Sequence, residues 1–261
     1  MNKLMKVFKR FEANFFLFEQ LVKRDFQKKY KRTVFGMAWS VISPLLTLFV
    51  MRLVFYNFFG RSTPHYTTYL FCGNIVMAYY KEGTRNGMSA LMSNANIITK
   101  INVPKYLFLF SKEIAALINF ALTLVVFFIF CVIDHITFTP KMFLLIYPIV
   151  CISILIVGVS MILSALYVFF KDIMYLYSVF LTLLTYLSAI FYTLDNFSQQ
   201  VQRLFLLNPV YVYIKYFRLI VIEAKIPSPQ YHALCAFYAL CLLAIGCWIY
   251  KKYNKQFIYY M

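Results

Sequence analysis

Side chains that could support acid–base, nucleophilic or metal chemistry are few and scattered in this sequence. The three histidines, His65, His135 and His232, lie near predicted loops, and none has a His, Cys, Asp or Glu partner at the spacing of a metal site. Carboxylates such as Asp172 and Asp195 lie near the ends of apolar stretches and form no set of nucleophile, base and orienting group. We therefore expect solvated loop histidines, and neither a metal centre nor a hydrolytic active site.

Chemical energy would have to reach this chain from another subunit. The sequence has no G-x-x-x-x-G-K-[ST] phosphate loop, and no polar stretch is long enough to fold as a nucleotide-binding domain. No apolar stretch carries a central acidic residue of the kind that couples transport to protons. The chain is expected to bind no cofactor itself and to catalyse no reaction of its own.

The composition is that of a protein embedded in a membrane. Of the 261 residues, 62% are hydrophobic and 13% are charged, and the mean hydropathy is +0.72. A spanning helix needs roughly 20 mainly apolar residues. Six stretches qualify, at residues 36–59, 66–82, 112–133, 142–169, 173–194 and 231–250. They are apolar on every side, which excludes a β-barrel. The predicted fold class is an all-α integral membrane protein with six transmembrane helices.

Basic residues set the predicted orientation. Most of the 26 Lys and Arg residues lie in residues 1–35, between the second and third stretches, and after the sixth. Because cytoplasmic loops are enriched in Lys and Arg, both ends of the chain are expected in the cytoplasm, with the spans in the cytoplasmic membrane. The net charge of +17 then reflects topology rather than a nucleic-acid groove.

Residues 1–35 form a predicted amphipathic interface segment. Apolar residues from Leu4 to Phe26 recur every three or four positions with Lys and Arg around them, which is typical of a helix lying on a membrane surface. The charged segment lacks the apolar core and cleavage site of a signal peptide, so we expect it to be retained. The pattern fits a simple basic anchor on anionic lipid as well as a functional helix.

One six-span domain is expected over residues 36–254, followed by a short tail at 255–261. Within it, segment 83–111 is the one sizeable cytoplasmic connection. Residues 93–101 predict a short helix with capping oxygens from Asn and Ser, ended by Pro104. This helix is either a docking element for another subunit or a connector.

Segment 195–230 is too polar to span a membrane and too apolar for a plain loop. Apolar residues at helical spacing on either side of Asn208-Pro209 predict two short helices at the outer interface. They can be re-entrant, since non-spanning backbone at membrane depth is tolerated where it is buried in protein or lines a cavity.

Four motifs resemble the type-2 permeases of ABC exporters for polysaccharides, which carry capsule, O-antigen and teichoic-acid polymers, and the resemblance covers essentially the whole chain. The first motif, Leu21 to Trp39 followed by Pro44, is similar to the family's entry into the first span. The second, Asn94 to Pro104, is similar to its coupling segment, and the third, Phe170 to Ile173, to its turn before span five. The fourth, Leu207 to Pro209 with Arg218, is similar to an Asn-Pro and Arg pattern on the family's outer side. Phe35, Val103 and Ala189 replace the Leu, Phe and Pro that are usual in the family.

The resemblance implies a homodimer of six-span permeases with a channel between them, each docked on a separate ATP-binding subunit. It implies a lipid-linked glycan as cargo, within a cell membrane and among its lipids. Site residues are then expected in four groups. A lipid-linked glycan bears phosphate, and Arg and Lys side chains suit phosphate oxygens, so guidance of the head group is assigned to Arg24, Lys28, Lys29, Lys31 and Arg32. Coupling to the ATPase is assigned to Asn94, Asn96, Ile97, Ile98, Thr99, Lys100 and Pro104. An outer gate is assigned to Asn208, Pro209 and Arg218.

Aromatic side chains are the fourth group and the expected glycan path. Aromatic residues make up 20% of the chain, and sugar rings can stack their C–H faces on an aromatic face while their hydroxyls meet the Tyr oxygen. Spans one and five resemble the family's channel-lining helices, which points to Trp39, Phe49, Tyr56, Tyr175, Tyr186 and Tyr192. The competing interpretation is that these rings only pack against lipid or collect at the membrane interfaces.

Two other functions stay open from the sequence. A type-2 permease for drugs or lipids would share the fold, but would carry a large extracellular domain or a tightly apolar cavity. A membrane-embedded glycosyl- or acyltransferase would carry carboxylate or histidine clusters at one membrane face, and the sequence has none.

Overall fold

The structure is a computed structural model that describes residues 14–31, 33–60, 63–101, 103–195 and 197–260. Every regular element in these ranges is a helix, which confirms the all-α class. In chain order the elements are α2 (Phe15–Tyr30), η1 (Gly36–Ala38), α3 (Trp39–Phe55), η2 (Tyr56–Gly60), α4 (Tyr66–Met88), η3 (Met92–Asn94), α5 (Ala95–Ile98), α6 (Tyr106–Ile133), η4 (Pro140–Leu145), α7 (Ile146–Phe169), α8 (Ile173–Tyr186), α9 (Gln199–Phe205), α10 (Pro209–Val221), α11 (Pro229–Tyr253) and η5 (Gln256–Tyr259).

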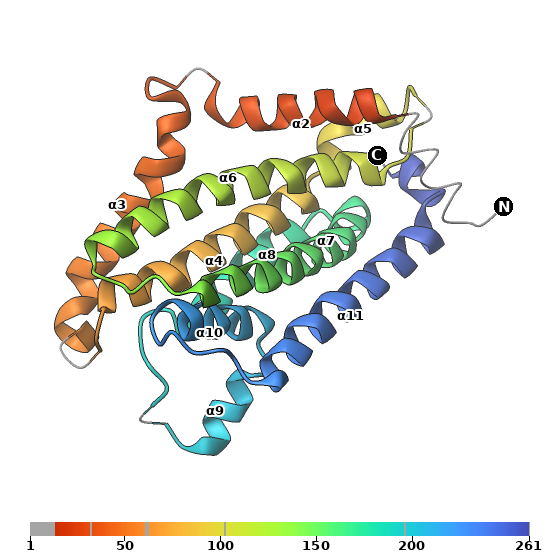
Figure 1. Cartoon of the computed structure of the whole chain (residues 1–261). Coiled ribbons are helices and arrows are strands. Elements are labelled where there is room, and N and C mark those ends of the chain that lie inside the picture. The colour runs from red at the N-terminus through yellow and green to blue at the C-terminus, as the bar shows by residue number, and fades with distance from the viewer. Residues whose placement is uncertain (1–13, 32, 61–62, 102, 196, 261) are drawn as a thin grey trace.

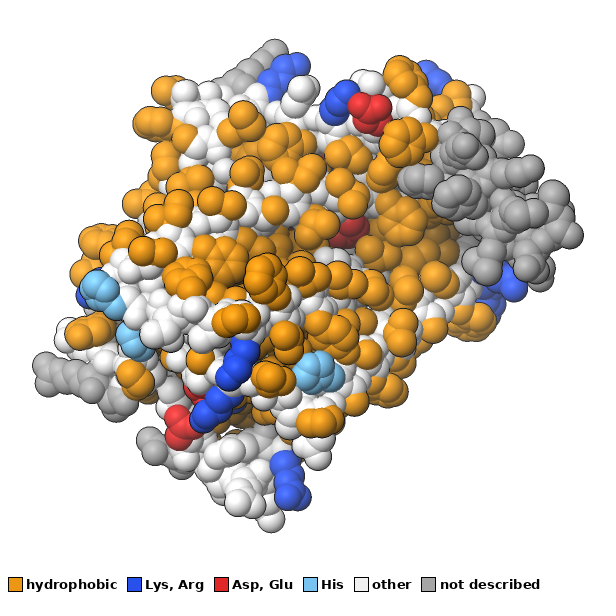
Figure 2. All heavy atoms as spheres, in the orientation of Figure 1, with side chains coloured by type: hydrophobic (Ala, Val, Ile, Leu, Met, Phe, Trp, Pro, Cys, Tyr) orange, Lys and Arg blue, Asp and Glu red, His pale blue; other side chains and the backbone are white. Residues whose placement is uncertain are grey.

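The long helices form a bundle with α4 at its centre (Figure 1). Most of α4 is buried, and it packs against α6, α7 and α10. Helix α2, the short helix α5 and the last turns of α11 lie at one end of the bundle, whereas α9 and α10 lie at the other (Figure 1). Apolar side chains cover the middle of the visible face, and Lys and Arg gather toward the two ends (Figure 2). This distribution suits a bundle that crosses a membrane.

Helices α7 and α11 are held together by direct contact between their backbones. A Cβ atom built on Gly158 would lie 2.5 Å from the backbone of Leu242 and Leu243, and one built on Gly246 would lie 2.8 Å from the Gly158 carbonyl oxygen. Glycine at these two positions therefore permits the close approach. Small residues play this part in membrane bundles because lipid offers apolar side chains no net gain in burial.

Six helices, α3, α4, α6, α7, α8 and α11, correspond to the six apolar stretches of the sequence. Four segments are long and apolar enough to cross a membrane on length and composition alone, namely Gly36–Gly60, Tyr106–Ile133, Pro140–Phe169 and Pro229–Tyr253. Helix α4 is too polar to qualify because its last turns contain Lys81, Glu82 and Arg85, and α8 has only 14 residues. A fifth span is possible if the bent pair α9 and α10 counts as one. The number six stays a prediction.

The predicted fifth stretch, 173–194, is helical only as far as Tyr186. The helix predicted for the rest of this stretch, residues 187–194, was wrong, because the chain turns sharply around Ala189, whose φ angle is +48°. Alanine rarely adopts this left-handed conformation. The family's usual Pro is absent at this position, yet the chain still breaks there.

Helix α2 lies across the end of the bundle and packs against α6 (Figure 1). Leu21 and Tyr30 are its buried residues, while Phe15 and Phe16 are exposed. The apolar stripe predicted from Leu4 onward is present here only in its second half, since its first half lies outside the described residues. A turn with Gly36 at φ +50° then leads into α3.

The connection from α4 to α6 contains a shorter helix than residues 93–101 predict. Helix α5 has four residues and follows the single 3₁₀ turn η3. The Asn94 side chain does not cap it: its amide nitrogen donates to the Ala90 carbonyl oxygen at 2.7 Å instead. The capping role predicted for Asn94 was wrong because this side chain faces back toward α4 and is buried.

The two short outer helices are present as predicted. The axes of α9 and α10 differ by 106°, so they form either a broken span or a re-entrant pair. The Asn208 side chain caps α10 by accepting from the Val210 and Tyr211 backbone N–H groups, and Pro209 occupies the first helical position, where its missing N–H has no helical partner to lose.

Candidate functional site

A groove of about 610 Å³ lies between α3, α4 and α6 and reaches Thr185 of α8. It begins beside Lys29 and Tyr30 at the end of α2, and Trp39 lies near this entrance. We call it the α3 groove. Its lining is Lys29, Tyr30, Thr33, Trp39, Ser40, Ser43, Pro44, Thr47, Met51, Asn74, Ile75, Met77, Ala78, Tyr79, Lys81, Glu82, Ala116, Asn119, Phe120, Thr123 and Thr185.

One wall of the α3 groove is a row of hydroxyl groups. Ser40, Ser43 and Thr47 are three or four residues apart, which places them on one face of α3. The Thr47 hydroxyl donates to the Ser43 carbonyl oxygen at 2.9 Å, and the Ser40 hydroxyl donates to that of Met37 at 2.7 Å. Each hydroxyl oxygen can still accept from a ligand. Sequence analysis missed these residues, although their helical spacing within an apolar stretch was a readable signal.

Helix α3 is poorly covered by the rest of the chain. Only 11% of its spanning window is buried, and apolar residues such as Leu46, Phe49 and Leu53 are exposed on a different side of the helix from the hydroxyl row. Polar groups are unfavourable against lipid tails and are expected to face protein or a water-filled path. This face of α3 is therefore suited to a second subunit or a polar pathway.

An ion-pair and hydrogen-bond network fastens α2 to the groove. The Glu82 carboxylate accepts from the Lys29 ammonium at 2.7 Å and from the Asn119 amide at 2.8 Å. The Asn119 amide oxygen in turn accepts from the Tyr30 hydroxyl at 2.6 Å. Residues from α2, α4 and α6 thus meet in one network, which sets the position of the groove entrance.

A second fastening of α2 lies at Asp25, whose side chain is 3% exposed. Its carboxylate accepts from Arg24 at 2.7 and 3.0 Å and from the Ser111 hydroxyl at 2.9 Å, and the Lys112 ammonium lies 3.8 Å away. Asp25 thus pairs with the neighbouring cations Arg24 and Lys112. The Arg24 guanidinium is therefore already paired within the chain.

The predicted head-group residues lie around two cavities beside α2. One, of about 490 Å³, is lined by Lys28, Lys29 and Lys112 together with Asp25 and Glu82. The other, of about 590 Å³, is lined by Arg24, Lys28 and Lys31 and also by Ser93 and Asn94 of the coupling segment. Arg32 lies outside the described residues. Lys28 and Lys31 are exposed and form no ion pair with any described acid, so they are the cations most available to an anionic ligand.

The coupling residues divide into buried and exposed sets. Asn94 and Ile98 are buried, Ile97 and Pro104 are half-buried, and Asn96, Thr99 and Lys100 are exposed. Ile98 packs in a cluster with Leu21 of α2 and Leu109 of α6. The segment thus presents a polar surface that is anchored to the bundle by its apolar side chains.

Three of the six predicted path aromatics share one cluster around the start of α4. The centroids of the Tyr56 and Tyr66 rings lie 6.3 Å apart. The Tyr192 carbonyl oxygen accepts from the Tyr69 hydroxyl, and the Tyr192 hydroxyl donates to the Tyr186 carbonyl oxygen, both at 2.8 Å.

The remaining three path aromatics lie apart from this cluster. Trp39 is at the groove entrance, 5.8 Å from the Phe35 ring. Phe49 and Tyr175 are exposed, on α3 and at the start of α8. The structure therefore supports no continuous aromatic row within one subunit.

Arg218 and Asn208 hold the broken end of α8. The buried Arg218 guanidinium donates to the backbone oxygens of Tyr69, Ala189 and Ile190, with its centre 3.4 Å from the centroid of the Tyr69 ring. The Asn208 amide donates to the Leu187 carbonyl oxygen and the Ser188 hydroxyl, both at 3.0 Å. These side chains satisfy carbonyl groups that the interrupted helix leaves without a partner.

A cavity of about 480 Å³ lies beside this turn. It is lined by Asp195 and Arg203 near α9 and by Lys215, Arg218 and Glu223 in and after α10. The predicted gate residue Arg218 therefore borders an outer polar cavity, although most of its donors are used within the fold.

One acidic residue and two of the three histidines depart from expectation. Glu113 lies two turns inside α6, because this helix begins at Tyr106 rather than at residue 112, and it is buried with one oxygen accepting from Ser160 at 2.6 Å. His65 lies 3.4 Å from the Asp134 carboxylate, and His232 contacts the Tyr216 hydroxyl at 2.8 Å, so neither is a purely solvated loop residue. Among the described residues, no group of three or more His, Cys, Asp or Glu side chains could hold a metal ion.

Known proteins resemble this chain along most of its length. The O-antigen export system permease protein RfbA of Klebsiella pneumoniae is 25% identical over 248 residues, which are 93% of this chain and 95% of that protein. A second protein of that name from the same organism is 29% identical over 164 residues, 60% of this chain and 62% of that protein. RfbA of Myxococcus xanthus is 22% identical over 241 residues, 91% of this chain and 92% of that protein.

The model of the ABC-2 type transporter family matches residues 17–222, which include α2, the whole α3 groove, the coupling segment and the outer helices α9 and α10. The match covers well over half of the chain. This protein is therefore a multi-pass membrane protein that belongs to the ABC-2 type transporter family.

Proposed function

We propose that this chain is the membrane subunit of an ABC exporter that carries a lipid-linked polysaccharide across the cytoplasmic membrane. Family membership implies a separate ATP-binding partner and a dimer of membrane subunits. Three relatives bear the name of an O-antigen export permease. The observation that carries the proposal is the α3 groove, a hydroxyl-lined path that starts at the basic helix α2 and runs along an uncovered helix.

The chemistry of the α3 groove suits a sugar chain. Pyranose rings have many hydroxyl groups, which exchange hydrogen bonds with Ser43, Thr47 and Asn74, and apolar faces, which stack on rings such as Trp39 and Tyr79. Weak repeated contacts of this kind let a polymer slide. A drug-carrying permease would instead need a tightly apolar cavity, and the hydroxyl wall of this groove argues against that alternative.

The cavities beside α2 suit the phosphate that a lipid carrier bears. Lys28 lines both of them, and Lys29 links the 490 Å³ cavity to the groove entrance through Glu82. Ammonium groups bind phosphate oxygens through charge-assisted hydrogen bonds. In the proposed function, the head group binds at Lys28 and Lys31 while the glycan enters beside Trp39. Arg24 contributes indirectly, because its pairing with Asp25 helps to fix the tilt of α2.

The export path proper is proposed to form between two copies of the chain. The exposed apolar faces of α3 and α8 are the surfaces that a second copy would cover, and both contribute residues to the groove. The termini and α5 are proposed to lie in the cytoplasm, where the ATP-binding subunit would contact the exposed face of α5.

Glycan export by a variant that lacks one hydroxyl of the α3 groove tests the proposal. Thr47→Val should lower the surface glycan by about threefold or more in cells that depend on this permease and its ATPase, since the loss of one hydrogen bond changes an equilibrium by this order. Thr182→Val is the matched control: both threonines are exposed and donate to the carbonyl oxygen four residues earlier, but Thr182 lies on α8 outside the groove.

The purified complex gives a second readout. A lipid-linked glycan should stimulate its ATPase activity, and Thr47→Val should weaken the stimulation without changing basal hydrolysis. Equal export by the Thr47 and Thr182 variants would remove the groove from the pathway. Stimulation by apolar drugs but by no lipid-linked glycan would assign the chain to the drug-carrying class.

A further inference from the structure

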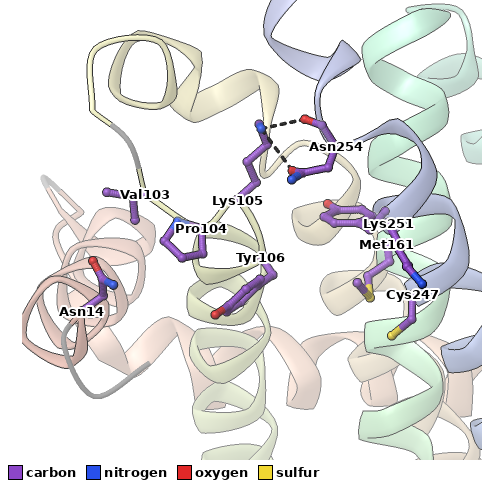
Figure 3. A pocket seen from close by; sticks show the side chains of 10 residues that line it. Asn14, Val103, Pro104, Lys105, Tyr106, Met161, Cys247, Lys251 and Asn254 are labelled. Carbon is purple, nitrogen blue, oxygen red and sulfur yellow. Dashed lines mark hydrogen bonds between the residues drawn. The ribbon is translucent and has the colours of Figure 1, made fainter. Parts of the chain in front are cut away.

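A pocket of about 650 Å³ lies at the α2 and α5 end of the bundle, on the side away from the α3 groove, between the start of α6 and the last turns of α11 (Figure 3). Its residues come from four places: Asn14 before α2, the corner that leads into α6, α7, and the end of α11. Of the roles argued above, only ATPase coupling touches this pocket, through Pro104. Its lining combines cations with an apolar floor.

The cations are Lys105 and Lys251. The Lys105 ammonium donates to the backbone and side-chain oxygens of Asn254, at 2.7 and 3.1 Å, and so joins the start of α6 to the end of α11 (Figure 3). Burial lowers the pKa of Lys105, because desolvation disfavours its charged form. An anion close by would favour the charged form and be bound in return. No acidic residue is among the described residues that line the pocket.

The floor is apolar. Met161 of α7 and Cys247 of α11 lie close together there (Figure 3). Tyr250 lies beside them, buried, with its hydroxyl bonded to Ser164 at 2.6 Å, so it offers its ring rather than a free hydroxyl. A ligand that fits must therefore join an anionic head to an apolar tail.

The depth of the pocket matches the surface of a membrane. Exposed aromatic and basic residues surround the end of α11: Trp248 lies under the Lys252 ammonium at 5.0 Å, and Tyr253 lies at 5.3 Å from it. Trp, Tyr and Lys collect at the level of lipid head groups. Lys105, which bonds Asn254 at the end of α11, then lies at head-group level, whereas Met161 and Cys247 lie toward the hydrocarbon, with the Lys251 amino group beside Cys247 (Figure 3).

We propose that this pocket binds one anionic phospholipid, with its phosphate bound by the flexible side chains of Lys105 and Lys251 and an acyl chain along Met161 and Cys247. Charge favours this occupant over the chain's own residues 1–13, in which Lys3, Lys6, Lys9 and Arg10 outnumber the one acid, Glu12, and would bring net like charge to the two lysines. The bound lipid also contacts Val103 and Pro104, which connect α5 to α6. It thereby steadies the segment proposed to receive the ATPase.

The experiment reads out Cys247 directly. Cys241 and Cys247 are the exposed cysteines of the chain, and the other four are buried. In a full-length Cys241→Ser variant held in neutral detergent, the rate of Cys247 alkylation should fall when phosphatidylglycerol is added and should not fall with phosphatidylcholine. The double variant Lys105→Gln with Lys251→Gln should raise the lipid concentration for half protection by roughly tenfold or more, since each cation near a lipid surface contributes to binding.

Glutamine preserves a donor for Asn254, so the double variant is designed to keep the contact between α6 and α11. The control is Lys252→Gln with Lys255→Gln, which removes the same charge from exposed residues outside the pocket, and it should leave protection by phosphatidylglycerol within twofold. Native mass spectrometry of the same samples should count one fewer tightly held lipid in the pocket variant than in the control.

Several results would overturn the proposal. Equal protection by inorganic phosphate would make this a site for a free anion, and equal protection by phosphatidylcholine would make it an apolar slot without charge selection. Alkylation that is already slow without lipid, and that no lipid changes, would assign the pocket to another part of the chain. If the Lys252→Gln, Lys255→Gln control lost protection by phosphatidylglycerol as much as the pocket variant does, the effect would come from the net charge of the protein and not from the pocket.

Discussion

Arg218 is the side chain on which the outer end of the bundle depends most. It is 3% exposed and donates to three backbone oxygens, at Tyr69, Ala189 and Ile190. A buried charge of this kind is tolerated only because most of its donors find an acceptor. The sequence named Arg218 as a gate residue, whereas the structure gives it a structural contact with the broken end of α8.

Replacing Arg218 by Met should therefore destabilise the fold. The apolar side chain fills much of the same space but leaves buried carbonyl oxygens without donors, which costs about 3 kcal/mol or more. The melting temperature of the purified protein in detergent measures the effect. Arg203→Met, at an exposed position lining the same outer cavity, should change stability by less than about 0.5 kcal/mol. Equal melting temperatures for the two variants would contradict the structural role.

Tyr186 and Tyr175 offer a matched test of the aromatic path. Both lie on α8 and are 59% and 67% exposed, but only Tyr186 contacts the outer aromatic cluster, with its ring 5.9 Å from that of Phe191. Tyr186→Ala should slow export severalfold while Tyr186→Phe retains most of it, because a ring contributes through stacking. Tyr175→Ala should export like the parent. Surface glycan appearing after a pulse of labelled sugar measures the rate, and identical rates for both Ala variants would refute a path through the cluster.

At the scale of elements, the contact between α7 and α11 is the firmest in the molecule. It depends on Gly158 and Gly246, where backbones meet. The contacts of α3 and α8 with the rest of the chain are far fewer. The two helices that we propose to meet a second subunit thus have few contacts within the chain, whereas α7 and α11 pack closely against each other.

Gly246→Val should separate α7 from α11. Even the first atom of the new side chain would lie 2.8 Å from the Gly158 carbonyl oxygen, so the backbones must move apart, at a cost of about 2 kcal/mol. Ile245→Val, one residue earlier on a more exposed face, is the control and should be nearly neutral. Thermal unfolding in detergent distinguishes them. If Gly246→Val and Ile245→Val have the same melting temperature, the close approach of α7 and α11 is wrong.

At the scale of the whole molecule, the proposed ATPase contact and the proposed glycan entrance lie on different elements at the same end of the bundle. The exposed face of α5 faces solvent beside α2, and one cavity is lined by residues of both α2 and the turn before α5. Movement of the coupling segment would therefore reach the basic helix directly, and from there the entrance of the α3 groove through Lys29 and Glu82.

Crosslinking tests this arrangement in the assembled transporter. Cysteine at Thr99 or Lys100 should crosslink to a cysteine on the docking face of the ATP-binding subunit, because both side chains are exposed on the coupling segment. Cysteine at Ile98 is the matched control. The Ile98 side chain directly precedes Thr99 in the sequence and is only 5% exposed, so a cysteine there should not react. Crosslinks formed only from the tail, at Tyr259 for example, would move the ATPase contact to residues 255–261.

The sequence alone determined the all-α membrane fold, the approximate ends of most long helices, the basic amphipathic helix and the two short outer helices. These properties follow from local composition and periodicity, because lipid requires every span to satisfy its own backbone and to show apolar side chains. The family followed as well, from short motifs around Arg24, Lys100, Asp172 and Asn208 whose order along the chain is itself a sequence property.

Only the tertiary structure decided which residues meet. The break of α8 at Ala189 is held by Arg218, which lies on α10, and the groove entrance is held by Lys29 with Glu82, 53 residues apart. The row of Ser40, Ser43 and Thr47 becomes a wall only because α4 and α6 lie opposite, and the lipid pocket exists only because α6 starts where α11 ends. Such contacts depend on how distant helices pack, and the periodicity of any one helix carries no information about its partner.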